Sequence, residues 1–318
     1  MVNQKTLQTI KDDLNSTLTK TRGIGNYTFK WYKHHAKSLG GFDEFVDWMK
    51  KVVDACDLEG AGTILDLGSG YSEHSYVLSR LGNKVIAVEP RKVYLSIMKE
   101  LSKKKGDKII FMVGDSMKLG LKDSSVDVVY LNETISHMRD FEGSMKEIVR
   151  VLKPKGRVVV MDTNRHTYQS WMTMTVQLEK IDKQYYVPVR RRAIKNSFSK
   201  HGVPCTYDEL NYLAENTKGW TNGDIRKWFD DEVSKTNFRS RFKPPYKCVD
   251  PRSGQYMENL YTPGEVMRIL ESYGFSCNEV VIQPPPRLHW LPDCISYWWK
   301  CPGKFIIVGT LNEAGGWL

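Results

Sequence analysis

Short apolar runs alternate with longer amphipathic segments through the first half of the chain. Five runs have the length of a buried strand, at 63–67, 85–89, 109–113, 126–131 and 157–161. The segments 71–81, 93–104 and 141–152 carry apolar residues at helical spacing. This alternation predicts a parallel α/β sheet whose strands are joined by right-handed helical crossovers.

The first predicted strand runs directly into the glycine-rich turn Gly68-Ser69-Gly70, and a predicted helix follows. Glycines let the backbone approach a ligand, and a helix N-terminus offers unpaired N–H groups, so the turn predicts a nucleotide-like ligand. Glu73 stands where a dinucleotide site would have a third glycine close to the pyrophosphate. Its charge favours a ligand without phosphates there. Glu89 follows the turn at about the spacing of a ribose-binding carboxylate.

Together these motifs resemble those of the class I S-adenosylmethionine-dependent methyltransferases. The resemblance rests on residues 66–70, Glu89, Asp115 and a turn at 152–157, which occur in the family's order. It covers about residues 54–163 and extends over 261–311. It implies an α/β, Rossmann-like, seven-stranded and mostly parallel sheet with helices on both faces. The last two strands are expected at 276–282 and 304–311, after a helix at 262–273 that Thr262 caps.

S-adenosylmethionine is the cofactor that the resemblance implies. Gly68 and Gly70 would lie against its methionine part, Glu89 would accept both ribose hydroxyls, and Asp115 would accept from the adenine amino group. The chain departs from the family at Ser72, where a third glycine is common, and serine suits that position if its φ is negative. The expected cofactor-binding residues are Asp66, Gly68, Ser69, Gly70, Glu89, Pro90, Asp115, Ser116 and Asn132.

The chain is expected to divide into an arm, a core and an insertion. Residues 1–53 would form a helical arm over the cofactor site, and 54–163 with 261–318 would form the cofactor-binding core. Residues 164–260 exceed what the core requires and carry helical patterns at 171–181, 206–215 and 221–233. An insertion after the fifth strand is expected to be a helical cap that walls the acceptor pocket. The alternative is a remote unit used for oligomerisation.

Methyl transfer depends mainly on alignment, because the sulfonium is already activated, and a base helps only where the acceptor loses a proton. His137, just after the fourth strand, is the first candidate base, with Glu133 as its orienting partner and His166 as the second candidate. For His137 a structural role at a helix start is the alternative. His74 is expected at the surface. The residues expected to bind the acceptor are Tyr27, Tyr32, His35, Asp162, Tyr168, Arg191 and Trp298.

Composition and charge narrow the setting. The net charge is +10. Three interpretations of the basic cluster 190–192 stay open: a solvated surface, an anchor for a phosphate or carboxylate group, and contact with nucleic acid or a membrane. The six cysteines form no C-x-x-C pair, which argues against a zinc site, so no metal is expected. Scattered cysteines also suit a reducing cytoplasm. The chain has neither an apolar run of about 18 residues nor an N-terminal apolar signal core.

Two classes of function follow. The first is methyl transfer to an O, N or C atom of a small or medium organic acceptor, with anionic and lipid-like molecules as candidates. Aromatic residues in the arm and late in the chain favour an enclosed, partly apolar pocket for it. The second is RNA methylation by the basic surface, which would bind RNA with a steep salt dependence. A non-catalytic relative that only binds the cofactor is a third alternative. The sequence leaves the oligomeric state undetermined.

Overall fold

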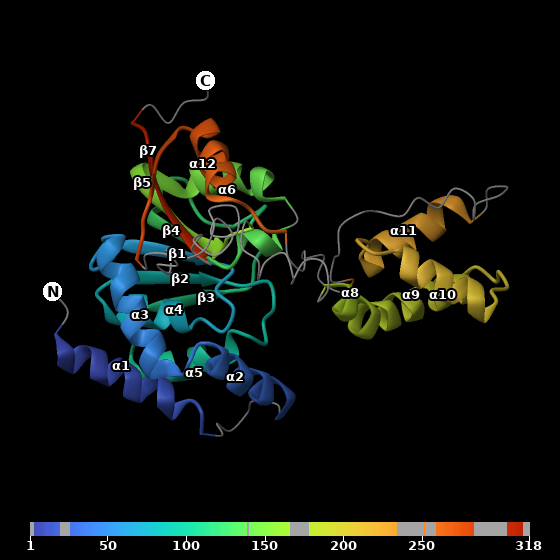
Figure 1. The fold of residues 1–318 in the computed structure, drawn as a ribbon, viewed down its shortest axis with the longest axis horizontal. Helices are drawn as coiled ribbons and strands as arrows, with labels where there is room; N and C mark the ends of the chain where they lie inside the picture. Colours follow the sequence, from blue (N-terminus) through green and yellow to red (C-terminus); the bar gives the residue numbers. More distant parts are fainter. Residues whose placement is uncertain are drawn as a thin grey trace, which may run out of the picture.

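A seven-stranded sheet forms the centre of the computed structural model (Figure 1). The structure describes residues 3–19, 26–138, 140–165, 178–233, 251, 259–282 and 304–313. The strands are β1 Thr63–Leu67, β2 Lys84–Val88, β3 Ile109–Met112, β4 Val126–Asn132, β5 Leu152–Thr163, β6 Phe275–Glu279 and β7 Lys304–Leu311. Their order across the sheet is β3-β2-β1-β4-β5-β7-β6. Only β7 runs antiparallel to its neighbours, which confirms the predicted α/β class and its mostly parallel sheet.

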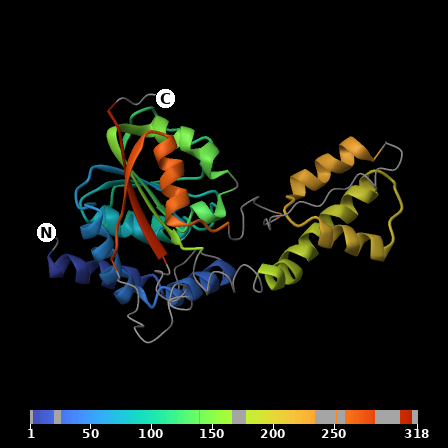
Figure 2. The ribbon, with the colours of Figure 1, turned by 45° about the horizontal axis from the view of Figure 1, so that its top comes forward.

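Helices cover both faces of the sheet (Figures 1 and 2). Side chains alternate between the faces of a strand, so Ile64 of β1 packs toward one layer and Leu65 toward the other. The first layer holds α3, α4 and α5, with α1 packed on α3 and α4, and the second holds α6 and α12. The helices around the sheet are α1 Gln4–Ser16, α2 Asn26–Ser38, α3 Phe42–Ala55, α4 Glu73–Arg80, α5 Ser96–Lys105, α6 Phe141–Val151 and α12 Pro263–Ser272.

The strand order reverses between β1 and β4, the central pair of the parallel part. The connection from β1 leads outward to β2 on one side of this pair, and the connection from β4 leads outward to β5 on the other side. In open α/β sheets ligands bind at such a point, outside the carboxyl ends of the strands. The loops that follow β1, β2 and β4 therefore frame the candidate site.

The fifth strand starts earlier than the sequence predicts. Residues 152–156 were expected to form a turn, but they belong to β5, which begins at Leu152. The pairing partner of Val126 is Leu152 and that of Val128 is Arg157, so the extra residues form an irregularity in the ladder. Lys155 has a φ of 61°, and a Cβ on Gly156 would lie 2.8 Å from the Lys153 carbonyl oxygen. This irregularity, which includes Lys155 and Gly156, lies where the turn was expected.

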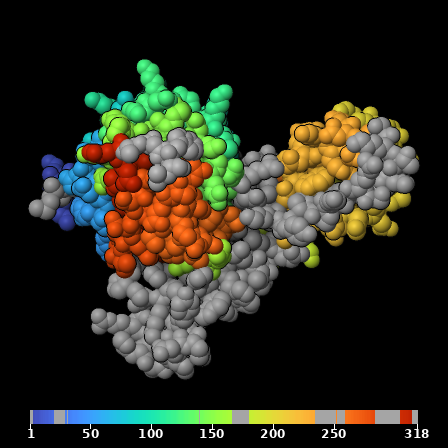
Figure 3. Space-filling model, turned by 90° about the horizontal axis from the view of Figure 1, so that it is seen from above, coloured from blue at the N-terminus to red at the C-terminus, as the bar shows by residue number. Residues whose placement is uncertain are grey.

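The inserted residues form their own helical unit. It contains α8 Leu178–Ile181, a π-helical turn at Asp182–Tyr186, α9 Val187–Lys200, α10 Tyr207–Asn216 and α11 Asn222–Glu232. A separate apolar core built around Ile194, Phe198 and Phe229 holds these helices together. The unit lies to one side of the sheet domain in all three views (Figures 1, 2 and 3). Its role as a cap over the acceptor stays a prediction.

Two predicted helix starts in this half are confirmed. Thr206 caps α10 by accepting from the Glu209 N–H, and Thr262 and Glu265 form a reciprocal capping box at α12. The N-terminal part contains the helices α1, α2 and α3, in line with the helical arm expected there. Within the described residues, no helix combines the length and the apolarity needed to cross a membrane.

Candidate functional site

The turn after β1 is tied to the second strand by main-chain hydrogen bonds. Gly68 N and Ser69 N both donate to the Val88 carbonyl oxygen, at 2.8 and 3.0 Å. Gly68 has a φ of 77°, and a Cβ on it would lie 2.4 Å from the Thr134 side chain. A residue other than glycine would therefore be strained and would clash. A Cβ on Gly70 would meet nothing within 4 Å, so open space lies beside the turn.

The Glu89 carboxylate lies directly against this turn. Gly70 N donates to Glu89 Oε2 at 3.1 Å, and Arg91 N donates to Oε1 at 3.0 Å. The residue is 5% exposed, and burial raises the pKa of its carboxyl despite these two donors. Two main-chain contacts thus fix the orientation of the carboxylate that the sequence assigns to the ribose. Pro90, the next residue, is exposed.

Two further acidic side chains, those of Asp66 and Glu73, lie near the turn. Asp66 accepts from Ser75 Oγ at 2.5 Å and is buried. Burial, together with the charges of Glu73 and Glu89, raises the pKa of Asp66 to about 7. The negative charges of Glu73 and Glu89 near Asp66 make this side of the turn suited to a cation. S-adenosylmethionine carries an ammonium and a sulfonium, so the residues present fit this cofactor.

Ser72 differs from the expectation. Its φ is 69°, in the left-handed region, where a negative value was expected for a serine. The Ser72 hydroxyl lies 3.0 Å from Ser69 Oγ, and Ser72 N donates to the Ser69 carbonyl oxygen at 2.7 Å. These two local contacts hold the turn in a conformation that glycine would adopt without strain.

The second helix of the arm lies against the glycine turn. His35 Nε2 is 3.0 Å from Glu73 Oε1, a buried carboxylate at the start of α4. Burial alone would lower the pKa of His35, but the Glu73 carboxylate outweighs it and the pKa is raised. The Tyr71 ring packs against Tyr32, His35 and Tyr94, with ring centroids 5.2, 5.2 and 4.7 Å away. Aromatic side chains therefore pack together beside the glycine turn.

Tyr32 is embedded in the arm. Its hydroxyl lies 2.7 Å from Thr17 Oγ1, and its side chain is fully buried. Its predicted role in acceptor binding stays a prediction, as does that of Tyr27, whose side chain lies outside the described part of α2.

His74 is buried, in contrast to the surface position expected from the sequence. Its Nδ1 lies 3.0 Å from the Tyr130 hydroxyl and its Nε2 3.2 Å from Asn132 Nδ2. Burial lowers the pKa of His74 to about 3, with a contribution from the charge of Lys304. Asn132, expected to face the cofactor, is thus connected to a neutral histidine beneath the strand ends.

Asp162 ties the end of β5 to the short helix that carries His137. That helix is a single 3₁₀ turn, Ile135–His137. Ser136 N donates to Asp162 Oδ2 at 3.1 Å, and Thr163 N donates to Oδ1 at 2.7 Å. Burial raises the pKa of Asp162, and the two main-chain donors partly oppose it. Both carboxylate oxygens already accept main-chain N–H groups, and its role toward the acceptor stays a prediction.

Glu133 and His137 follow β4 as expected. Glu133 has a φ of 46°, and its carboxylate pairs with Lys304 Nζ at 2.7 Å. The charge of His137 lowers the pKa of Glu89, so the two groups lie within electrostatic range of each other. His137 ends the short 3₁₀ helix that follows β4, and its role as a base stays a prediction. The pairing of Glu133 with His137 stays a prediction.

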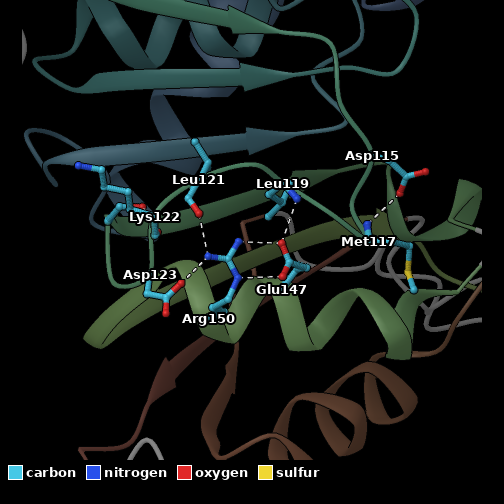
Figure 4. A network of polar contacts seen from close by, with 9 residues as sticks. Asp115, Met117, Leu119, Leu121, Lys122, Asp123, Glu147 and Arg150 are labelled. Carbon is cyan, nitrogen blue, oxygen red and sulfur yellow. Dashed lines mark hydrogen bonds and ion pairs between the residues drawn. The ribbon is translucent and has the colours of Figure 1, made fainter.

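A salt-bridge network anchors the loop that carries Asp115 (Figure 4). Arg150 of α6 makes a bidentate contact with Glu147, at 2.8 Å for each pair, and donates to Leu121 O at 2.7 Å. Leu119 N donates to Glu147 Oε2 at 2.9 Å. The Arg150 contact lowers the pKa of Glu147 to about 2, so the network is ionised at neutral pH.

Asp115 itself is exposed at the other end of this loop. Its Oδ1 accepts from Met117 N at 2.8 Å, and its Oδ2 is the oxygen not used in that contact. Ser116 accepts from Ser144 Oγ of α6 at 2.8 Å. The loop is thus held to α6 at both ends, which fixes the place of the predicted adenine contact.

Arg191 lies in the helical insertion. Its guanidinium lies 5.9 Å from the centre of the Tyr207 ring. The neighbouring Arg190 is fully buried and makes a bidentate contact with Asp182, at 2.8 Å for each pair. Arg190 is therefore removed from any binding surface of the cluster 190–192. His166, Tyr168 and Trp298 lie outside the described residues.

Sequence reasoning missed the polar contacts beneath the site. The pair His74–Tyr130 and the contact of Ser136 with Asp162 join residues 56 and 26 positions apart. Nothing in the spacing along the chain predicts these pairs, although the sequence does show polar residues at the ends of the predicted strands. In the part of the chain that the structure describes, no group of three or more His, Cys, Asp or Glu residues is placed to hold a metal.

Comparison with known proteins gives independent information. A methyltransferase domain family matches residues 65–160. The demethylmenaquinone methyltransferase of Streptomyces griseus is 29% identical over 173 residues, which is 54% of this chain and 68% of the relative. The demethylmenaquinone methyltransferase of Staphylococcus saprophyticus is 28% identical over 203 residues, 63% of this chain and 81% of the relative.

A solved structure supports the fold. The S-adenosylmethionine-dependent methyltransferase from Archaeoglobus fulgidus superposes with a TM-score of 0.50 at 12% identity. The alignment covers 88% of this chain and 99% of that chain. At this identity the likeness concerns the fold alone.

Proposed function

Because this chain is a class I S-adenosylmethionine-dependent methyltransferase, we propose that it methylates a lipid-like organic acceptor of small or medium size. The observation that carries the proposal is the aromatic pair Tyr71 and Tyr94 beside the glycine turn. Aromatic rings beside the cofactor suit an acceptor with an apolar body. The relatives named for demethylmenaquinone support the same class, an aromatic ring with an isoprenoid tail.

Glu89, Gly68 and Gly70 would hold the cofactor, with Asp66 beneath the turn and Asp115 at the adenine end. The cofactor supplies an activated methyl group when bound. The protein's own contribution is to align the acceptor and to exclude water. Where the acceptor loses a proton, His137 is the proposed base, because it follows β4 at the carboxyl ends of the strands.

The acceptor class is tested by following the labelled methyl group. The full-length protein would be given S-adenosylmethionine labelled in the methyl group and either a reduced, short-chain demethylmenaquinone in detergent or total RNA at low salt. We expect label in the quinol and none in RNA. Transfer to RNA, falling steeply as salt rises, would replace this proposal with the nucleic-acid one.

Two variants separate cofactor binding from turnover. Glu89→Ala removes a carboxylate assigned two ribose hydroxyls, so it should weaken cofactor binding at least about a hundredfold. His137→Ala should leave that affinity unchanged and lower turnover by about a hundredfold if the base is needed. Calorimetry with the demethylated product and initial rates measure the two effects. Unchanged affinity in Glu89→Ala would refute the ribose assignment, and full turnover in His137→Ala would return that residue to a structural role.

A further inference from the structure

His74 is a buried histidine beside the candidate site that the steps described above do not use. It is the second residue of α4 and is 9% exposed. Three aromatic rings surround it, with centroids at 4.9 Å for Phe45, 6.1 Å for Trp48 and 5.8 Å for Tyr130. Packing alone would be satisfied by a phenylalanine. The imidazole nitrogens must therefore be explained by what they contact.

The two nitrogens of His74 have defined roles. Burial keeps the ring neutral, so one nitrogen donates and the other accepts. Nε2 faces Asn132 Nδ2 at 3.2 Å, and an amide nitrogen can only donate, so Nε2 accepts. Nδ1 then carries the proton and donates to the Tyr130 hydroxyl at 3.0 Å. The Tyr130 hydroxyl donates in turn to Met49 Sδ at 3.9 Å, which completes a consistent chain.

This chain fixes the amide of Asn132. Asn132 ends β4, whose Tyr130 pairs with Asp66 of β1, so it lies at the point where the strand order reverses. Its Nδ2 is engaged by His74, and its Oδ1 is buried without a hydrogen-bond partner among the described residues. A buried carbonyl oxygen without a partner is unfavourable and calls for a ligand group.

We propose that His74 is a positioning residue that reserves Asn132 Oδ1 for the positively polarised C–H groups around the cofactor's sulfonium. The oxygen would accept weak C–H hydrogen bonds that a charged sulfur strengthens and a neutral sulfur does not. His74 touches neither the cofactor nor the acceptor, and acts through the orientation of the amide. The inference rests on the methyltransferase activity and is independent of which acceptor is used.

The test compares affinities for S-adenosylmethionine and for its demethylated product. His74→Phe keeps the ring and loses both nitrogens, so Asn132 is free to turn. We expect its affinity for S-adenosylmethionine to fall about threefold to tenfold, the effect of one hydrogen bond, with less than about a twofold change for the product. His74→Gln can place an amide group near the position of Nε2 and should recover most of the difference.

A double-mutant cycle and a spectroscopic measurement complete the test. In an Asn132→Ala background, His74→Phe should leave the ratio of the two affinities unchanged. Nitrogen-15 shifts of the wild-type ring should show a proton on Nδ1 and no titration between pH 5 and 8. An equal loss of affinity for both ligands, a protonated Nε2, or additive effects in the cycle would overturn the proposal. Because these readouts need no acceptor, they stay separate from the test of acceptor class.

Discussion

Asp66 is a buried carboxyl group whose ionisation opposes folding. Its pKa is raised to about 7 in the folded protein, chiefly by burial, against about 3.9 in an unfolded chain. Between these values the folded state retains a proton that the unfolded state has released. The contribution of Asp66 therefore lowers the free energy of unfolding as pH rises from about 4 to about 7, by at most about 1.4 kcal/mol per pH unit.

The Asp66→Asn variant lacks this titration. We expect the free energy of unfolding of the variant, relative to the wild type, to rise from about pH 4 to about pH 7 and then to level off. Urea unfolding of the cofactor-free protein at several pH values measures it. Ser199→Ala, an exposed change on α9 that involves no titratable group, serves as the control and should give a flat difference. A flat difference for Asp66→Asn as well would contradict a raised pKa.

At the scale of elements, α6 determines the position of the loop after β3. Arg150 and Glu147 of this helix hold the main chain at Leu119 and Leu121. Arg150→Met keeps an unbranched apolar stem and removes the guanidinium with its charge. We expect a loss of about 1 to 3 kcal/mol in stability, faster hydrogen exchange at Leu119, and weaker cofactor binding, because Asp115 is carried by the same loop.

Hydrogen exchange and calorimetry would measure these effects. Arg226→Met, an exposed change on α11 of the insertion, removes the same charge without touching the loop. It should alter neither the exchange at Leu119 nor the affinity. If Arg150→Met loosened the loop and left the affinity intact, the assignment of Asp115 to the adenine would lose its support.

For the molecule as a whole, the question is whether the insertion and the sheet domain depend on each other. Arg190 and Asp182 are paired in the separate core of the insertion, where Arg190 is fully buried. Arg190→Met removes the guanidinium that pairs with the buried Asp182 carboxylate, at a cost of about 3 to 5 kcal/mol. We expect helix to be lost from the insertion, with cofactor affinity in the sheet domain unchanged.

Circular dichroism and calorimetry on the same sample separate the two domains. The double variant Asp182→Asn with Arg190→Met removes both charges and should recover much of the helix. Loss of cofactor affinity in Arg190→Met would show that the insertion supports the site, as a cap would. Turnover with an acceptor then distinguishes a cap that binds only the acceptor from a remote unit.

The sequence alone predicted most strands of the sheet and the glycine turn after β1. Strand β1 is confirmed at both bounds, because a short apolar run ended by glycines has little alternative to a buried strand and a turn. Glu89 was located by its distance from Gly70 along the chain, and the two are in contact. These features are local in sequence, so periodicity and spacing suffice to predict them.

The tertiary structure decided which polar residues are buried and which partners they have. His74 was expected at the surface and is buried, because α3 of the arm covers α4 and supplies Phe45 and Trp48. Arg190 stands among three adjacent arginines, yet it alone is fully buried against Asp182. Burial and pairing depend on elements distant in sequence, so no pattern along the chain predicts them. Because burial and pairing shift the pKa values of the site, the tertiary structure also determines those values.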